Sequence, residues 1–283
     1  MKQLYGPISG HKFLAWIESN HGLIAIDTGW DVAAGEAYEG SDIEALVLAS
    51  EASQKPLTHI LLTHDHWDHC ANLSLLQARW PEVKIYAHTN SSVDGITEPL
   101  YGGETLHLDG IAIQVIYTPG HSLNRDEVCY YLPDYDFLFS GDVAQPQGPS
   151  YSFANGVSPV PYFHHAEAYS TTLDRLVRLK PKRLRTGHGD FLGPEQAKQW
   201  LRVALATLMR MEELAITLTE RYPDKENDWL VDLLYDYIVD ERHYPFRDAK
   251  HRQRHSTYGG ETDYERFDKP GMLALIVAAK ATM

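Results

Sequence analysis

The sequence predicts an α/β fold over residues 1–193, followed by a helical C-terminal region over residues 194–283. Two patterns indicate this division. Up to about residue 193, short apolar runs of strand length alternate with turn residues and with segments of helical periodicity. Beyond that point, the apolar residues recur mainly at helical spacing. With 283 residues, of which 43% are hydrophobic and 23% charged, the chain can bury a substantial core.

The N-terminal part predicts a pair of strands. Residues 12–19 and 22–29 are both apolar and strand-like, and the Asn-His-Gly at 20–22 suits a tight reversal between them. Asp27 lies near the end of the second strand. This part of the chain is therefore expected to form a hairpin with a carboxylate at its exit.

The next elements are a helix and a series of strands. Ser41 with Glu44 three residues later predicts a capped helix that ends near Pro56. Further strands are expected at 58–63, 83–88, 110–118, 128–133 and 135–142, and further helices at 164–179, 194–222, 227–241 and 269–281. Residues 242–267 predict a long loop, and loops of that length are usually functional or disordered.

Charge and composition exclude some classes of function. The chain has 25 Lys and Arg against 39 Asp and Glu, a formal net charge of -14, which disfavours nucleic acid as a partner. No run approaches the length of a membrane span and no signal peptide is apparent, so we expect a cytoplasmic protein that does not bind membranes. The two cysteines, Cys70 and Cys129, predict buried small hydrophobes rather than disulfides or nucleophiles.

The stretch THDHWDH at residues 63–69 carries the strongest chemical signal. If the segment is extended, His64, His66 and Asp68 point to one side, and a turn at Asp68 brings in His69. Imidazoles and a carboxylate suit zinc and similar metals. A solvated loop whose histidines satisfy backbone groups is the alternative. Trp67 is expected to pack beneath this loop.

Three further ligand types follow predicted strands, each beside a glycine. His121 follows residues 110–118, Asp142 lies in SGD at 140–142, and His188 lies in TGHG at 186–189. Glycine lets backbone segments approach closely where several loops meet. Function is often carried by loops at one end of a sheet, so we expect these residues to converge with the THDHWDH segment.

Together these signatures resemble the metallo-β-lactamase superfamily. They are HxHxDH (64–69), PGHS (119–122), SGD (140–142) and TGHG (186–189), preceded by IDTG at 26–29, and they occur in the order expected for that family. The resemblance covers roughly residues 10–190. It implies an αβ/βα four-layer sandwich of two mixed β-sheets flanked by helices, with a catalytic domain at 1–193 and a helical appendage at 194–283 that closes over or flanks the active site.

The resemblance also implies a dinuclear metal centre. Its ligands would be His64, His66 and His121 for one metal, Asp68, His69 and His188 for the second, and Asp142 as the bridge. Two divalent ions are expected, with zinc preferred and iron or manganese as alternatives. Asp68 would also act in catalysis by orienting the bridging hydroxide and handling its proton. Asp27 would support the histidine loop, although a plain turn aspartate is an equal alternative.

The implied function is hydrolysis of an ester-type bond, a thioester or a lactone, in a small metabolite by the metal-bridging hydroxide. A phosphodiesterase using the same metals, or a β-lactamase-like side activity, is the alternative. Mononuclear iron chemistry is not excluded by the motif alone. No glutathione-binding pattern is clear in the C-terminal segment, which argues against glutathione thioesters.

Substrate contacts are expected from two segments. Tyr151, Phe153 and Tyr162 follow Asp142 in the chain and would line the pocket, although ordinary packing is the alternative for each. Arg247 belongs to a basic cluster at 242–254 that would bind a carboxylate or phosphate, and a charged surface loop is the alternative. The sequence leaves homo-oligomerisation open.

Overall fold

The computed structural model describes residues 2–29, 41–145, 160–241, 261–262 and 264–283. The chain divides into two compact units. The first comprises Met1–Asp142 and Pro181–Ala197, and the second comprises Val143–Lys180 and Lys198–Met283. The helix expected at 194 does begin at Pro194, and the second unit takes in residues 143–180 as well as the C-terminal helices.

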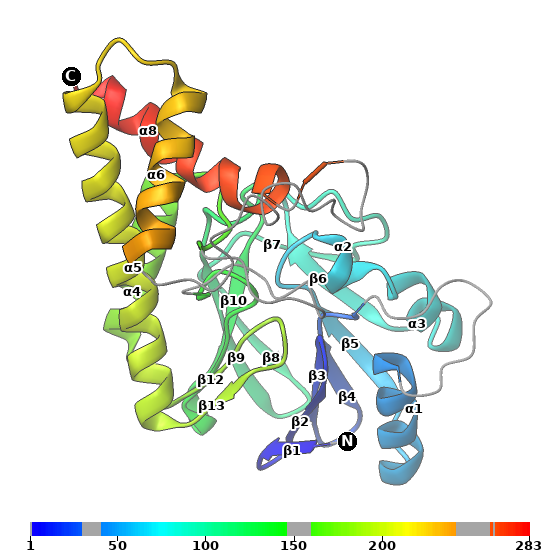
Figure 1. Ribbon diagram of the computed structural model, residues 1–283. Helices are drawn as coiled ribbons and strands as arrows, with labels where there is room; N and C mark the ends of the chain where they lie inside the picture. Colours follow the sequence, from blue (N-terminus) through cyan, green and yellow to red (C-terminus); the bar gives the residue numbers. More distant parts are fainter. Residues whose placement is uncertain (1, 30–40, 146–159, 242–260, 263) are drawn as a thin grey trace. The chain divides into compact units, whose positions relative to one another are not determined.

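The first sheet of the first unit has seven strands in sequence order (Figure 1). The first four strands form an antiparallel meander, whereas the last four, which share β4 with the meander, run parallel. The strands are β1 (Lys2–Tyr5), β2 (Ile8–His11), β3 (Leu14–Glu18), β4 (Leu23–Ile26), β5 (Leu57–Leu61), β6 (Lys84–His88) and β7 (Glu98–Leu100). The predicted hairpin is confirmed as β3 and β4, because Ala15 pairs with Ile26 and Glu18 with Leu23.

The second sheet of this unit has six strands in the order β13-β12-β11-β10-β9-β8. All neighbours are antiparallel except β11 and β12, which are parallel. The strands are β8 (Thr105–Leu108), β9 (Ile111–Tyr117), β10 (Val128–Leu132), β11 (Phe137–Phe139), β12 (Arg183–Arg185) and β13 (Phe191–Leu192). Both sheets are therefore mixed, as expected.

The two sheets pack face to face through one apolar cluster. Ile24 from β4, Leu61 from β5, and Ile113, Tyr130 and Phe137 from the second sheet are all completely buried in it. Because strand side chains alternate between faces, Leu23 and Ala25 leave this cluster and join a second one on the other face of the first sheet. That second cluster also contains residues of helices α1 (Asp42–Ser53) and α3 (Leu73–Arg79), so these helices cover the first sheet (Figure 1).

Helix α1 starts where its cap predicts. Ser41 Oγ accepts a hydrogen bond from Glu44 N at 3.0 Å, and this bond satisfies one backbone donor that the helix itself leaves free. The helix ends at Ser53, three residues ahead of Pro56, and is followed by Gln54 in the left-handed conformation.

The second unit is built from helices. They are α4 (Ala166–Leu179), α5 (Pro194–Arg221), α6 (Asn227–Glu241), α8 (Lys269–Ala281) and a π-helix η2 (Tyr264–Asp268). Helix α8 packs on α6 and α4, and the Tyr264 hydroxyl donates to Asp232 Oδ1 at 2.6 Å. The π-helix corrects part of the loop predicted over 242–267, because this hydrogen bond and the burial of Tyr264 order its end. None of the described helices is long and apolar enough to cross a bilayer.

Candidate metal centre

The predicted ligands follow the C-terminal ends of strands. His64 comes after β5, His121 after β9, Asp142 after β11 and His188 after β12. In the second sheet β9, β11 and β12 run in the same direction, so their carboxyl ends open onto one edge. Ligands of α/β proteins commonly bind at such edges. The expectation that these four loops converge is met by the geometry below.

The first group consists of His64, His66 and His121, whose ligand atoms lie within 4.8 Å of one another. His66 Nδ1 lies 3.0 Å from His64 Nε2 and 3.1 Å from His121 Nε2. His64 and His121 are 2% exposed, and His66 is half-buried. Three imidazole nitrogens thus face one point, and this group contains no carboxylate.

The second group consists of Asp68, His69, Asp142 and His188, again within 4.8 Å of one another. Asp68 Oδ2 lies 3.6 Å from His69 Nε2 and 3.7 Å from His188 Nε2. His188 Nε2 is 2.8 Å from Asp142 Oδ2. This group therefore combines two imidazoles with two carboxylates.

Asp142 is the side chain that links the two groups. The same Oδ2 that contacts His188 lies 3.8 Å from His121 Nε2 in the first group. The position is consistent with the bridging role that the family resemblance implies. All seven predicted ligands are brought together in this one unit of the protein.

Asp27 lies beneath the second group and supports both ligand loops. It adopts a left-handed conformation (φ 59°) just after β4, which aspartate tolerates better than most residues. Its Oδ1 accepts from the backbone of Thr63 at 2.7 Å, and its Oδ2 lies 2.9 Å from His69 Nδ1. The carboxylate thus orients the ring so that Nε2 faces the group, an arrangement common around metal-binding histidines.

Glycines permit the close approach of the ligand loops, as expected. A Cβ on Gly187 would lie 2.2 Å from Asp142 Oδ1 and 2.5 Å from His69 Cε1. A Cβ on Gly141 would lie 2.8 Å from Thr63 Oγ1, and Gly141 also has a positive φ of 50°. Any side chain at Gly187 would therefore occupy the space in which the second group assembles.

The donor set fits divalent cations of the zinc type. Two imidazole nitrogens bound to one tetrahedral zinc lie about 3.3 Å apart, because Zn–N bonds are about 2.0–2.1 Å long. The nitrogens of the first group are spaced 3.0 and 3.1 Å apart, close to that value. In the second group, His69 Nε2 and Asp142 Oδ1 are buried 3.4 Å from each other, and neither atom makes a well-formed hydrogen bond within the described part of the chain. A cation bound there would satisfy both atoms.

The two groups differ in their electrostatics. Burial, followed by the neighbouring His69, His66 and His121, holds the pKa of His64 well below its usual value. Burial likewise acts against a charge on His69, but the carboxylates of Asp142, Asp68 and Asp27 outweigh it and raise the pKa of His69 well above the ordinary value. The first group therefore favours neutral imidazoles, whereas the second is a region of negative potential that attracts cations.

The structure corrects the expected path of the HxHxDH segment. Residues Trp67–Cys70 form a short helix, α2, so Asp68 lies in a helical turn beside His69 rather than in line with His64 and His66. Asp68 accordingly joins the second group. Trp67 does not pack beneath the loop as expected, since it is 37% exposed. Cys129 is buried as predicted, whereas Cys70 is half-buried, and burial raises the pKa of its thiol to about 12.

The substrate-binding predictions stay untested. Tyr151, Phe153 and Arg247 lie outside the described residues. Tyr162 belongs to the second unit, where its hydroxyl lies 2.9 Å from His164 Nε2 and its ring packs edge-on against Phe267.

Sequence reasoning missed several residues that shape the site. Phe13, in the turn between β2 and β3, packs its ring against His188 at a centroid distance of 5.0 Å. The turn is held by Arg185 Nη2, which donates to the carbonyls of Lys12 at 2.8 Å and Leu14 at 3.1 Å. An apolar residue in a predicted strand gives no signal of such a role. Thr63 was missed too, although it directly precedes His64.

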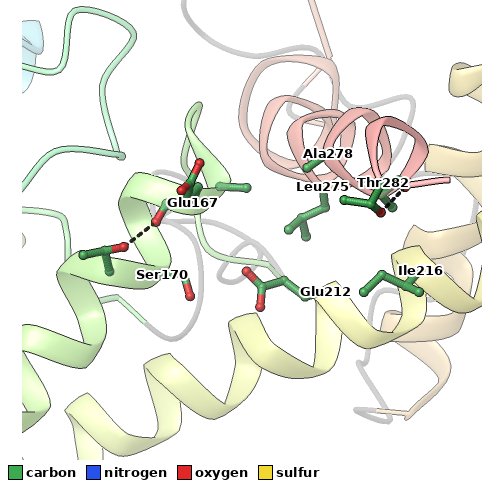
Figure 2. Close-up of a pocket in the computed structure, with 10 residues that line it drawn as sticks. Glu167, Ser170, Glu212, Ile216, Leu275, Ala278 and Thr282 are labelled. Atoms are coloured by element: carbon green, nitrogen blue, oxygen red, sulfur yellow. Dashed lines mark hydrogen bonds between the residues drawn. The ribbon is translucent and has the colours of Figure 1, made fainter.

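A separate cavity of about 310 Å³ lies wholly in the second unit (Figure 2). It is lined by residues of α4, α5 and α8, including Glu212, Ile216 and Leu275. Burial raises the pKa of Glu212, whereas a hydrogen bond with Ser170 opposes the shift. The lining contains no histidine or cysteine, so this cavity does not offer the donor set found at the strand ends.

Comparison with known proteins agrees with the geometry. A family model described as the metallo-beta-lactamase superfamily matches residues 14–188, which is more than half of the chain. A hydroxyacylglutathione hydrolase from Legionella pneumophila (strain Paris) is 30% identical over 97 residues, covering 34% of this chain and 37% of that relative. Thioesterase pkgB from Emericella nidulans is 30% identical over 172 residues, covering 59% and 42%. The chain thus matches about two fifths of the length of these relatives.

Solved structures with the same fold are also found. A metallo-beta-lactamase family protein from Thermus thermophilus superposes with a TM-score of 0.54 at 18% identity, covering 81% of this chain and 88% of that chain. A metallo-beta-lactamase from Pontibacter korlensis gives 0.53 at 20% identity, with 71% and 88% covered. These similarities confirm the two-sheet fold. The family model, which matches more than half of the chain, shows that the chain belongs to the metallo-beta-lactamase superfamily.

Proposed function

We propose that this protein is a dinuclear metal-dependent hydrolase that cleaves an ester-type bond, foremost a thioester, in a small metabolite. The observation that carries the proposal is the pair of ligand groups joined by Asp142 Oδ2, which lies 2.8 Å from His188 and 3.8 Å from His121. Many metallohydrolases use two neighbouring cations, and two such donor groups support the same arrangement here.

The comparisons favour a thioester over a lactone or a phosphodiester. Relatives carry the names hydroxyacylglutathione hydrolase, thioesterase, and atrochrysone carboxyl ACP thioesterase, the last from Aspergillus fumigatus. All three names denote cleavage of a carbon–sulfur ester. Because the alignments cover less than half of each relative, the identity of the acyl group and the thiol does not transfer to this chain.

The protein side chains would have distinct roles. His64, His66 and His121 would hold one cation, and Asp68, His69 and His188 the other, with Asp142 facing both. When bound, such cations polarise a carbonyl and lower the pKa of a bound water to about 7. Asp27 would keep His69 oriented through the 2.9 Å contact with Nδ1.

Asp68 is the best placed of these residues to handle a proton. It is 2% exposed, and its Oδ2 faces His69 and His188 at 3.6 and 3.7 Å. With Oδ2 facing the second cation, the other carboxylate oxygen, Oδ1, would orient the attacking water and receive its proton. Its burial keeps bulk water away, so the interaction with the reacting atoms is little screened.

The test is a substrate panel with the zinc-loaded protein. Thioester, lactone, phosphodiester and lactam substrates would be compared at equal protein and zinc concentrations. We expect the thioester to be hydrolysed at least about tenfold faster than the others, with about two metal ions per chain by elemental analysis. Iron- and manganese-loaded samples, assayed in parallel, would show which cation supports the fastest turnover.

The matched control is the same protein after chelation, which should lose activity and regain it with added zinc. Full thioesterase activity in the metal-free protein would contradict the proposal. If the phosphodiester were cleaved fastest, the protein would be a phosphodiesterase rather than a thioesterase, and the proposed metal centre would stand.

A further inference from the structure

Two buried acidic residues lie behind the loop that carries His121. The loop connects β9 and β10 and ends in Asp126 and Glu127, each 1% exposed. A buried carboxylate is costly unless hydrogen bonds or charges compensate it. Here Asp126 Oδ2 and Glu127 Oε2 have no hydrogen-bond partner in the described structure. Neither residue belongs to the two ligand groups, so their burial calls for a separate explanation.

Glu127 holds the backbone on both sides of His121. The N–H of Ser122 donates to Glu127 Oε1 in a short hydrogen bond. The N–H of Gly120, on the other side of the histidine, also interacts with this carboxylate and favours its charged form. The carbonyl of Glu127 accepts from Thr118 N at 2.9 Å, which closes the loop at its base. The residues flanking His121 are therefore tied to one side chain.

Asp126 ties this loop to the loop of His64 and His66. Its Oδ1 accepts from Ser122 Oγ at 2.6 Å, and the backbone of Asp65 interacts with its carboxylate and favours the charged form. Asp65 lies between His64 and His66 in the sequence, and its Oδ2 accepts from Asn124 Nδ2 at 2.7 Å. The Asp126 carboxylate and the Asn124 side-chain amide thus both connect the loop of His121 to Asp65 in the loop of His64 and His66.

We propose that Asp126 and Glu127 are positioning residues that hold His121 in register with His64 and His66, so that the first ligand group is formed before a cation binds. The proposal rests on the proposed function only in taking this group as a metal ligand set. The His121–His66 contact of 3.1 Å requires the two loops to keep a fixed separation. Metal sites tolerate errors of only about 0.5 Å in such placements.

Burial is consistent with this role. Burial raises the pKa of Asp126 to about 6, although the hydrogen bond from the Ser122 hydroxyl opposes the shift. Burial also raises the pKa of Glu127 to about 8, although the hydrogen bond from the Ser122 amide opposes that shift. Both groups stay buried despite this cost because they accept backbone and side-chain donors of the ligand loops.

The experiment is a calorimetric titration of zinc into the metal-free protein, with elemental analysis of the loaded sample. His121→Ala and His188→Ala identify which binding event belongs to which group. Glu127→Leu removes the hydrogen-bond acceptor but keeps a side chain of similar size. We expect it to weaken zinc binding to the first group about 10- to 100-fold, while the affinity of the second group changes less than about twofold. Glu127→Gln keeps an acceptor oxygen and should bind within about threefold of the unaltered protein.

The matched control is Asp136→Asn. Asp136 follows the other end of β10 and likewise accepts a backbone amide, that of Lys182 at 3.0 Å, so both binding events should be unchanged in this variant. If Glu127→Leu does not fold, Ser122→Ala removes only the hydroxyl donor to Asp126 and should still weaken the first-group event more than about threefold.

Unchanged zinc affinity in Glu127→Leu, accompanied only by lower thermal stability, would overturn the proposal, as would unchanged affinity in Ser122→Ala. Zinc binding in two events without any hydrolysis would contradict the proposed function but leave this inference standing. Absence of zinc binding by the unaltered protein would overturn both.

Discussion

The two ligand groups are neighbours but are built on different principles. The first consists of three imidazoles, held from behind by the carboxylates of Asp126 and Glu127. The second places two carboxylates among its ligands and is supported by Asp27 and the ring of Phe13. One group therefore has its acidic residues mainly in the supporting layer, whereas the other has them among the ligands.

This difference indicates that a cation in the second group would be held mainly by electrostatic attraction. A cation in the first group would be held mainly by the fixed positions of the imidazole nitrogens. In the second group, cation binding is favoured by Asp68 and Asp142 directly. In the first group, neutral imidazoles must already be in position, because Asp142, which it shares with the second group, is the one ligand carboxylate among the described residues that reaches it. Asp142 reaches both groups and should be the residue on which the pair most depends.

Replacing Asp142 should have the largest effect. Asp142→Ala removes the side chain that faces both groups, so we expect hydrolysis to fall more than about a thousandfold and bound metal to fall below two ions per chain. Turnover assays and elemental analysis would measure these effects. Near-normal activity with two ions bound would show that Asp142 is not part of the metal centre and does not link the two groups.

Replacing Asp27 should weaken the second group more than the first, because Asp27 contacts a ligand ring of the second group but only Thr63 beside the first. Asp27→Ala deletes the acceptor for His69 Nδ1 and for the Thr63 amide, and we expect the zinc affinity of the second group to fall about 10- to 100-fold. Zinc titration would resolve the two events, with Asp136→Asn as the control. Equal weakening of both events would show that Asp27 supports the whole centre rather than one group.

The two groups should also lose their metals at different chelator concentrations. Because the second group contains two carboxylates and the first reaches only the shared Asp142, we expect the second to retain its cation to about tenfold higher chelator concentration. Elemental analysis during stepwise chelation should therefore pass through a state with one ion per chain. Simultaneous loss of both ions would show that the shared Asp142 outweighs the difference in charge.

The smallest expected effect concerns the pH dependence of stability. Burial raises the pKa of Glu127 to about 8, above the value of about 4.3 for an unfolded glutamate. Between these values the folded chain keeps a proton that the unfolded chain has released, so this group lowers stability as the pH rises from about 4 to about 8. Glu127→Gln abolishes that contribution. The variant should gain about 2 to 5 °C in Tm relative to the unaltered metal-free protein between pH 5 and pH 8.

The Tm of both proteins would be measured across this range by thermal unfolding in the presence of chelator. Parallel pH dependence of the two proteins would mean that Glu127 is ionised in the folded state. The supporting layer of the first group would then carry full negative charge, and the contrast with the second group would be weaker.

Much of the centre could be predicted from local patterns. His64, His121, Asp142 and His188 each follow an apolar run that does form a strand, and the short distance along the chain leaves them little freedom to lie elsewhere. The hairpin of β3 and β4 and the cap at Ser41 were predictable for the same reason, since their signals lie within a few residues. The short helix α2 was not, because it is a single turn of four residues without a side-chain cap and so leaves no local signal.

The residues that support the ligands could not be predicted from local sequence patterns. Asp126 and Glu127 look like ordinary charged residues of a loop, and their burial arises only when the loop folds against Asp65, some sixty positions earlier in the chain. Phe13 reaches His188 across an even longer sequence separation, through a turn anchored by Arg185. No spacing rule links residues that are brought together by the packing of separate strands.

The sequence by itself determined which side chains can bind a metal and at which strand ends they occur, because the identity of a donor atom and the alternation of apolar runs are local properties. The family resemblance implied how those donors divide into two groups, whereas tertiary structure alone decided that Asp68 reaches His69 through a helical turn, how closely the donors approach one another, and which buried carboxylates support them. The physical reason is that distances of about 3 Å between side chains depend on how strands from two sheets are packed and registered, and each sheet is assembled from segments far apart in the chain.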